Sequence, residues 1–215
     1  MPALLTRLQR GLEQLYRIAT GLDVGDFVID AELRAAALDD AVHPRAPREQ
    51  LLLAEDGGGL SVALFVDPGV VAHLERHDPA AALGDHNVGD FLLAVEGVSH
   101  FVYAVYCAQH GRPVSALELE LQGEVDKYVT CVLTAGDSAA PGRLRRRLFD
   151  DFDFEPDLDA VERDRYRVAN ENARQFAASL ERRFSRGGIG DMLSELRRFY
   201  RLPLGAKLAH IARAA

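Results

Sequence analysis

The sequence predicts a mainly helical α+β protein, in which a helical bundle surrounds a small antiparallel β-hairpin or sheet. Three observations indicate this class. Apolar residues recur at helical spacing over most of the 215 residues. One pair of apolar runs flanks a glycine-rich turn, which is typical of a β-hairpin. The stretch from Phe91 to Ala108 is apolar on almost every side, as expected of a buried central helix.

The N-terminal part of the chain supplies the hairpin. Leucines at helical spacing first predict a helix over residues 3–20, which Gly21 ends. Residues 49–67 then read EQLLLAEDGGGLSVALFVD, two apolar strands joined by glycines. Because an isolated hairpin is only marginally stable in water, we expect helices to cover it or a third strand to join it. Residues 26–30, DFVID, are the candidate for that strand.

The central part of the chain predicts an antiparallel pair of helices. The first is the buried helix over residues 88–110, which Gly111 ends. Ser115 and Glu118 match a capping box at the start of the second helix, which runs to about residue 133. The letters LELEL in this region also alternate like a strand. The short connection makes the two helices antiparallel neighbours.

The C-terminal part predicts a linker and further helices. We expect residues 1–142 to form an α+β core domain, residues 143–157 a linker, and residues 158–215 a helical segment that packs on the core. Two glycines at 187–188 are expected to interrupt those helices. The alternative is one single domain over residues 1–215.

Composition and charge limit the functional classes. The chain is 48% hydrophobic, enough for a substantial core, and its net charge of −8 disfavours general binding of nucleic acid. The first residues lack the apolar core and cleavage site of a secretory signal. Glu96 and His100 near the middle of the apolar run argue against a membrane span. We therefore expect an acidic protein of the bacterial-type cytoplasm that does not bind membranes.

The leading functional hypothesis is a non-catalytic interaction, adaptor or accessory protein with a protein partner and no cofactor. The chain shows no complete catalytic set, and its charge is uneven: residues 1–142 hold 9 basic and 21 acidic side chains, whereas residues 143–215 hold 16 and 12. Basic side chains on the last helices, Arg197, Arg198 and Arg201, are the candidate partner-binding residues.

The alternative is a metal-binding or small-ligand-binding helical protein, or an enzyme, with a buried site at Glu96 and His100. These residues are four apart and share a helix face, as do Glu120 and Glu124 on the next helix. Antiparallel packing can bring the two pairs together, as in di-iron proteins. Those proteins use two Glu-x-x-His motifs, however, and this chain has none. The sequence therefore favours no stoichiometric transition metal.

A simpler interpretation of the same residues is structural. Glu96 then pairs with His100, Lys127 or Arg112, while Glu120 and Glu124 lie on a solvated helix face. Other candidate groups are likewise interpreted as surface or core residues, because each lacks the motif its chemistry needs. They are His73, His77 and His86 for metal, Ser99 and Cys107 as nucleophiles, and the polar residues Asn170, Glu171 and Asn172.

Overall fold

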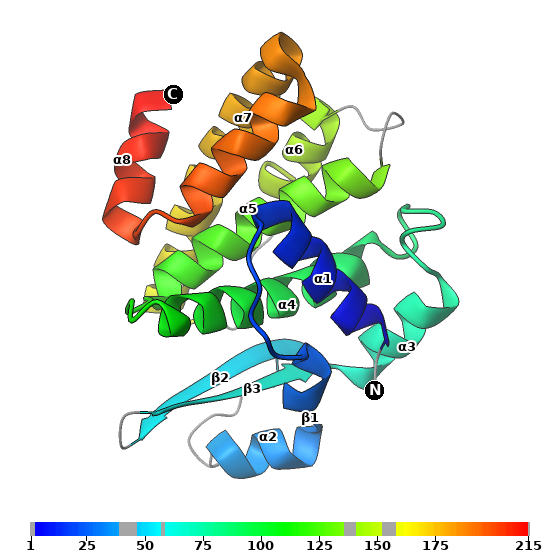
Figure 1. Cartoon of the computed structure of the whole chain (residues 1–215). Helices are drawn as coiled ribbons and strands as arrows, with labels where there is room; N and C mark the ends of the chain where they lie inside the picture. Colours follow the sequence, from blue (N-terminus) through cyan, green and yellow to red (C-terminus); the bar gives the residue numbers. More distant parts are fainter. Residues whose placement is uncertain (1–2, 39–46, 57–58, 136–140, 152–157, 215) are drawn as a thin grey trace.

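A computed structural model of the chain describes residues 3–38, 47–56, 59–135, 141–151 and 158–214. These residues form the predicted mainly helical α+β fold, with a small three-stranded sheet at one end (Figure 1). The helices are α1 (Ala3–Tyr16), α2 (Ala31–Leu38), α3 (Pro68–Arg76), α4 (Val88–Gln109), α5 (Ala116–Ala135), α6 (Pro141–Phe149), α7 (Ala160–Tyr200) and α8 (Leu204–Ala214). The strands are β1 (Val28–Ile29), β2 (Glu49–Asp56) and β3 (Gly59–Val66).

The sheet contains the predicted hairpin and one added strand. Strands β2 and β3 pair antiparallel, with Glu49 opposite Val66 and Leu51 opposite Leu64. Strand β1, from the segment predicted to join the hairpin, pairs with the other edge of β3. It runs parallel to β3, so the sheet is mixed rather than purely antiparallel. The chain between β1 and β3, which includes α2 and β2, provides the long connection that parallel strands require.

Helix α4 is the centre of the fold, as its apolar sequence predicted. It lies between the sheet on one side and helices α1 and α5 on the other (Figure 1). Val98 and Phe101 are fully buried, and Val95 and Val102 are almost so. The helix is long and apolar enough to cross a membrane, but 78% of its most apolar window is buried inside the protein. Packing on every side accounts for its composition.

Helix α5 begins as predicted, although the capping box is only half formed. Ser115 Oγ accepts a hydrogen bond from the backbone N–H of Glu118 at 3.2 Å. The Glu118 carboxylate is instead buried and accepts from the Tyr103 hydroxyl at 2.6 Å. A complete capping box opens α7, where Asp159 and Glu162 each accept from the backbone N–H of the other.

The C-terminal helices differ from the sequence prediction at one point. Residues 141–149, predicted as the end of the core domain and the start of a linker, form helix α6, because Leu148 and Phe149 supply a buried face. The expected interruption at 187–188 is confirmed, since Gly188 has a φ of 74° and kinks α7. Helix α7 packs on α5 and α1. The linker's residues 152–157 lie outside the described residues, and the division into domains stays a prediction.

Candidate functional site

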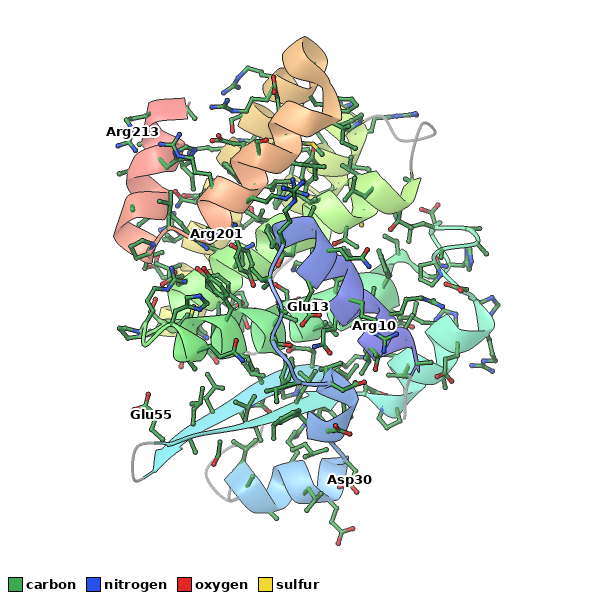
Figure 2. The ribbon with its side chains drawn as sticks, viewed as in Figure 1. Arg10, Glu13, Asp30, Glu55, Arg201 and Arg213 are labelled. Atoms are coloured by element: carbon green, nitrogen blue, oxygen red, sulfur yellow. The ribbon has the colours of Figure 1, made fainter. Side chains whose placement is uncertain are left out.

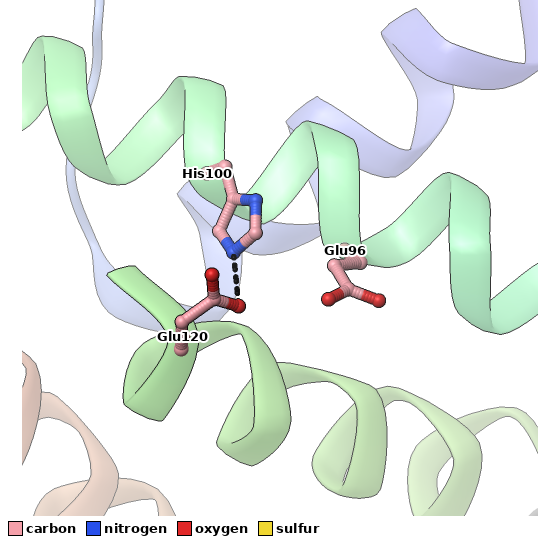
Figure 3. Close-up of side chains that lie close together, drawn as sticks. All are labelled: Glu96, His100 and Glu120. Carbon is pink, nitrogen blue, oxygen red and sulfur yellow. Dashed lines mark ion pairs between the residues drawn. The ribbon is translucent and has the colours of Figure 1, made fainter. Parts of the chain in front are cut away.

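Two helices bring the predicted polar residues together. Glu96 and His100 project from α4 toward Glu120 of α5 (Figure 3). One potential ligand atom from each residue lies within 4.8 Å of the others. The distance from His100 Nε2 to Glu120 Oε2 is 3.8 Å. The i, i+4 spacing on α4 and the antiparallel packing of α4 and α5 produce this arrangement, as the sequence indicated.

Glu120 and Glu124 are buried, so the interpretation that placed them on a solvated face is wrong. Their exposed fractions are 8% and 7%. Helix α7 packs on this part of α5, and Arg165 lies with its Nε 3.6 Å from Glu120 Oε1. The sequence interpretation missed this cover because α7 is about forty residues further along the chain.

Lys127 neutralises part of the cluster. Its Nζ donates to Glu124 Oε1 at 2.8 Å and to Glu96 Oε2 at 3.2 Å. Burial raises the pKa of Glu124, despite the nearby Lys127. Burial also opposes ionisation of Glu96, but Lys127 and His100 outweigh it and lower the pKa of that carboxyl. Of the predicted partners of Glu96, Lys127 is therefore the residue that donates a hydrogen bond to its carboxylate.

Glu49, at the start of β2, is a member of the cluster that the sequence did not reveal. Its Oε1 lies 3.5 Å from His100 Nδ1. Among the described residues, neither Glu49 Oε1 nor His100 Nε2 has a hydrogen-bond partner, although both atoms are buried. A carboxylate on one ring nitrogen and an open second nitrogen are typical of metal-binding histidines, because the carboxylate fixes the tautomer and the ring orientation.

Two helical glycines make this packing possible. A Cβ at Gly97 of α4 would lie 2.9 Å from Glu49 Cγ. A Cβ at Gly123 of α5 would lie 3.0 Å from His100 Nε2. Glycine inside a helix costs roughly 1 kcal/mol relative to alanine. At these two positions the absence of a Cβ allows Glu49 and His100 to lie close to the helix backbones, which offsets that cost.

Replacing Gly97 with alanine is expected to destabilise the protein by about 1 kcal/mol or more, because the new Cβ displaces Glu49. The matched control is Gly11→Ala in α1, where no described atom outside the adjacent residues and the helix's own backbone lies within 4 Å of the new Cβ. That change should stabilise the protein by roughly 0.5–1 kcal/mol. Urea denaturation of both variants checks the opposite signs. Equal stabilisation would show that Glu49 moves aside freely.

Burial dominates the electrostatics of the site. It raises the pKa of Glu120 to about 7, although the nearby His100 acts in the opposite direction. Burial lowers the pKa of His100, but the contact with Glu49 and the charges of Glu120 and Glu96 outweigh it and raise that pKa to about 9. With Glu49 and Glu124 included, four carboxylates of the described residues therefore face three cationic groups: His100, Lys127 and Arg165.

A second buried polar cluster lies on the opposite face of α5. Asp126 accepts hydrogen bonds from Ser99 Oγ at 2.5 Å, from Gln122 Nε2 at 2.9 Å and from the Tyr16 hydroxyl. Lys207 of α8 donates from Nζ to Gln122 Oε1 at 2.6 Å. Burial raises the pKa of Asp126 to about 6, against the effect of its three hydrogen bonds. The cluster joins α1, α4, α5 and α8.

Within the segments that the structure describes, the remaining candidates do not form catalytic sets. His73 contacts Asp90 at 2.7 Å, and the His77 ring lies between those of His73 and His86 near the surface. The Ser99 hydroxyl donates a hydrogen bond to the Asp126 carboxylate. Cys107 is buried and accepts from Arg112 at 2.8 Å, and burial raises the pKa of its thiol.

On α7, Asn170 is buried, Asn172 bonds to the carbonyl of the preceding turn, and Glu171 pairs with Arg167.

The predicted partner-binding arginines lie where α7 meets the end of α1. Arg197 donates to the Leu15 carbonyl at 2.8 Å. Arg201, which Figure 2 labels, donates to the Tyr16 carbonyl at 3.0 Å. Arg198 is exposed. Two of the three guanidinium groups therefore bind the C-terminal carbonyls of α1, which favour cations. Partner binding by these residues stays a prediction.

No protein-family model matches the chain, and comparison with curated proteins and with solved structures finds no significant match. The function must therefore be argued from the geometry of the site.

Proposed function

We propose that this protein binds a divalent transition-metal ion through Glu96, His100 and Glu120. The observation that carries the proposal is the Nε2 atom of His100, which has no hydrogen-bond partner in the described part of the chain. The side chain is only 9% exposed, and Nε2 faces two carboxylates within 4.8 Å. An imidazole with carboxylate oxygens suits zinc, manganese or iron. Ligand atoms around such an ion are at most about 4.4 Å apart, so small side-chain movements would complete the set.

Charge balance supports the same proposal. Burying carboxylates without paired cations is costly. A metal ion takes the lone pair of neutral His100 in place of a proton, which exchanges one positive charge for two. The four carboxylates Glu49, Glu96, Glu120 and Glu124 would then be balanced by Lys127, Arg165 and the ion. Glu49 would accept from Nδ1–H and hold the imidazole in the ligating orientation.

The test is metal binding by the purified, chelator-treated protein. We expect Mn²⁺ or Zn²⁺ to bind at one equivalent, measured by calorimetric titration and by elemental analysis. His100→Gln and Glu120→Gln should each weaken binding at least tenfold. Glu49→Gln, which leaves the three ligands in place but alters the orienting partner and removes its charge, should weaken it by about 10–100-fold.

The matched control is His77→Gln, which removes an exposed histidine of the surface group. It should leave the metal affinity unchanged. Absence of binding, or binding that survives His100→Gln and is lost in His77→Gln, would overturn the proposal. Circular dichroism of each variant establishes that the fold is retained.

A further inference from the structure

A lysine ammonium group joins two carboxylates beside the proposed metal ligands. Lys127 Nζ of α5 donates to Glu124 Oε1 at 2.8 Å and to Glu96 Oε2 at 3.2 Å. Lys127 and Glu124 are buried, and the Glu96 side chain is only 16% exposed. A cation held by buried carboxylates of two facing helices occupies the kind of position that metal ions take in helical bundles.

Glu96 links this position to the proposed metal ion. A carboxylate has two oxygens, and each of them can contact a different cation. Glu96 can therefore hold Lys127 with Oε2 and the metal ion with Oε1. In di-iron carboxylate proteins, glutamates of facing helices hold a pair of ions. Helices α4 and α5 likewise supply Glu96, Glu120 and Glu124, but a lysine ammonium group lies between Glu96 and Glu124.

The charges of the described cluster balance with one divalent ion and Lys127. The four carboxylates then face Lys127, Arg165 and the ion, and no net charge remains. A second divalent ion would overlap the ammonium group, and it would leave two excess positive charges where little water is present to screen them. The wild-type protein is therefore expected to hold one ion rather than two.

We propose that Lys127 occupies the position of a second metal ion and limits the site to one ion. The first ion rests on the proposed function, whereas the second position is defined by the contacts of Lys127 itself. Without the ammonium group, one excess negative charge remains on buried carboxylates and attracts a cation. Carboxylate and water oxygens suit Mn²⁺, and ionisation of one water ligand offsets the extra charge of a divalent ion.

The test is the number of Mn²⁺ ions that Lys127→Ala binds near neutral pH. Alanine removes the ammonium group and opens space beside Glu124, so we expect two equivalents, against one for the wild type. Calorimetric titration and elemental analysis count the ions. Electron paramagnetic resonance adds a second readout, because two Mn²⁺ ions that share the Glu96 carboxylate are magnetically coupled and give a spectrum unlike that of isolated ions.

Two further proteins locate the second ion. The double variant Lys127→Ala, Glu124→Gln lacks one of the two carboxylates and should return to one equivalent. The matched control is Lys207→Ala, which removes the other lysine of the chain. Lys207 is also buried, but it donates to the neutral amide of Gln122, so its loss should leave the number of bound ions unchanged.

Thermal unfolding keeps the test decisive if Lys127→Ala folds poorly without metal. Removing one partner of a buried ion pair is strongly destabilising, because the other partner stays buried and uncompensated. A second Mn²⁺ ion should restore much of this loss, since a ligand that binds only the folded chain stabilises it. Mn²⁺ should therefore raise the unfolding midpoint more in Lys127→Ala than in the wild type. A variant that stays unfolded in saturating Mn²⁺ would contradict the proposal.

The results distinguish the role of Lys127 from the metal site itself. If the wild type and Lys127→Ala each bind one ion, a proton rather than an ion replaces the ammonium group, so the role assigned to Lys127 is wrong and the metal site stands. If the wild type binds none and Lys127→Ala binds one ion that Glu124→Gln removes, the metal site fails alone. Absence of binding to both proteins would overturn both proposals.

Discussion

Replacing Val98 with aspartate is expected to destabilise the protein by several kcal/mol, enough to remove most of its net stability. Val98 is fully buried in α4, between the sheet and the flanking helices. An unpaired carboxylate there loses its hydration and gains no cation. Small proteins have a net stability of about 5–15 kcal/mol, so such a loss leaves a chain that is partly unfolded near room temperature. Thermal and urea denaturation followed by circular dichroism measures the effect.

The matched control is Val161→Asp on α7, where the valine is 74% exposed. An exposed change is expected to stay within about 0.5 kcal/mol of the wild type, and aspartate near a helix N-terminus is favourable. Similar melting of Val98→Asp and the wild type would show that α4 is not the centre of the core. It would also remove the scaffold on which Glu96 and His100 depend.

Those elements of the fold that depend on short-range sequence patterns could be predicted from the sequence. The periodicity of α4 and α5, the hairpin glycines and the break at Gly188 are all short-range signals. The parallel pairing of β1 with β3 was not predictable in this way, since strand direction depends on the path of the intervening chain. Helix α6 was missed because its apolar face is short and its arginines dominate the segment.

The residues of the candidate site likewise divide into those that local spacing predicts and those that it does not. Glu96, His100 and Glu120 were identified from i, i+4 spacing on two adjacent helices. Glu49 and Arg165 come from a strand and a distant helix, so no local pattern connected them with His100. Two signals were nevertheless present: the glycines within α4 and α5, and the lysines. The chain has only two lysines, Lys127 and Lys207, and both are buried in polar clusters.

Lys207 leads to the second large prediction, which concerns pH. Its side chain is fully buried, and Nζ lies 4.2 Å from the centre of the Tyr103 ring. Burial lowers the pKa of Lys207 to about 7, from an ordinary value of 10.5. The charges of Glu118 and Asp126 raise the pKa but do not compensate for burial, and Arg112 lowers it further. The amine is therefore expected to be largely neutral in the folded protein above neutral pH.

We expect the free energy of unfolding of the wild type to rise with pH relative to that of Lys207→Met. Between pH 7 and 10.5 the unfolded chain holds a proton on Lys207 that the folded chain has lost, so raising the pH favours folding. From pH 7 to 9.5 the difference between the two free energies of unfolding should change by about 3 kcal/mol. Taking the difference between the wild type and Lys207→Met cancels the contributions of other titrating groups. Urea denaturation at several pH values measures the difference, and parallel curves would contradict the expectation.

A direct measurement is available because the chain contains only two lysines. In protein labelled with ¹³C at the lysine Cε, one resonance should titrate near pH 7 and disappear from the spectrum of Lys207→Met. The other belongs to Lys127, whose pKa is lowered by burial but raised more strongly by Glu124 and Glu96, so it should stay charged throughout. The same amine chemistry thus gives opposite shifts in two buried sites, because Lys127 contacts two carboxylates whereas Lys207 donates to a neutral amide. If both resonances kept the chemical shift of a charged amine up to pH 9.5, Lys207 would be an ammonium stabilised by Glu118 and Asp126.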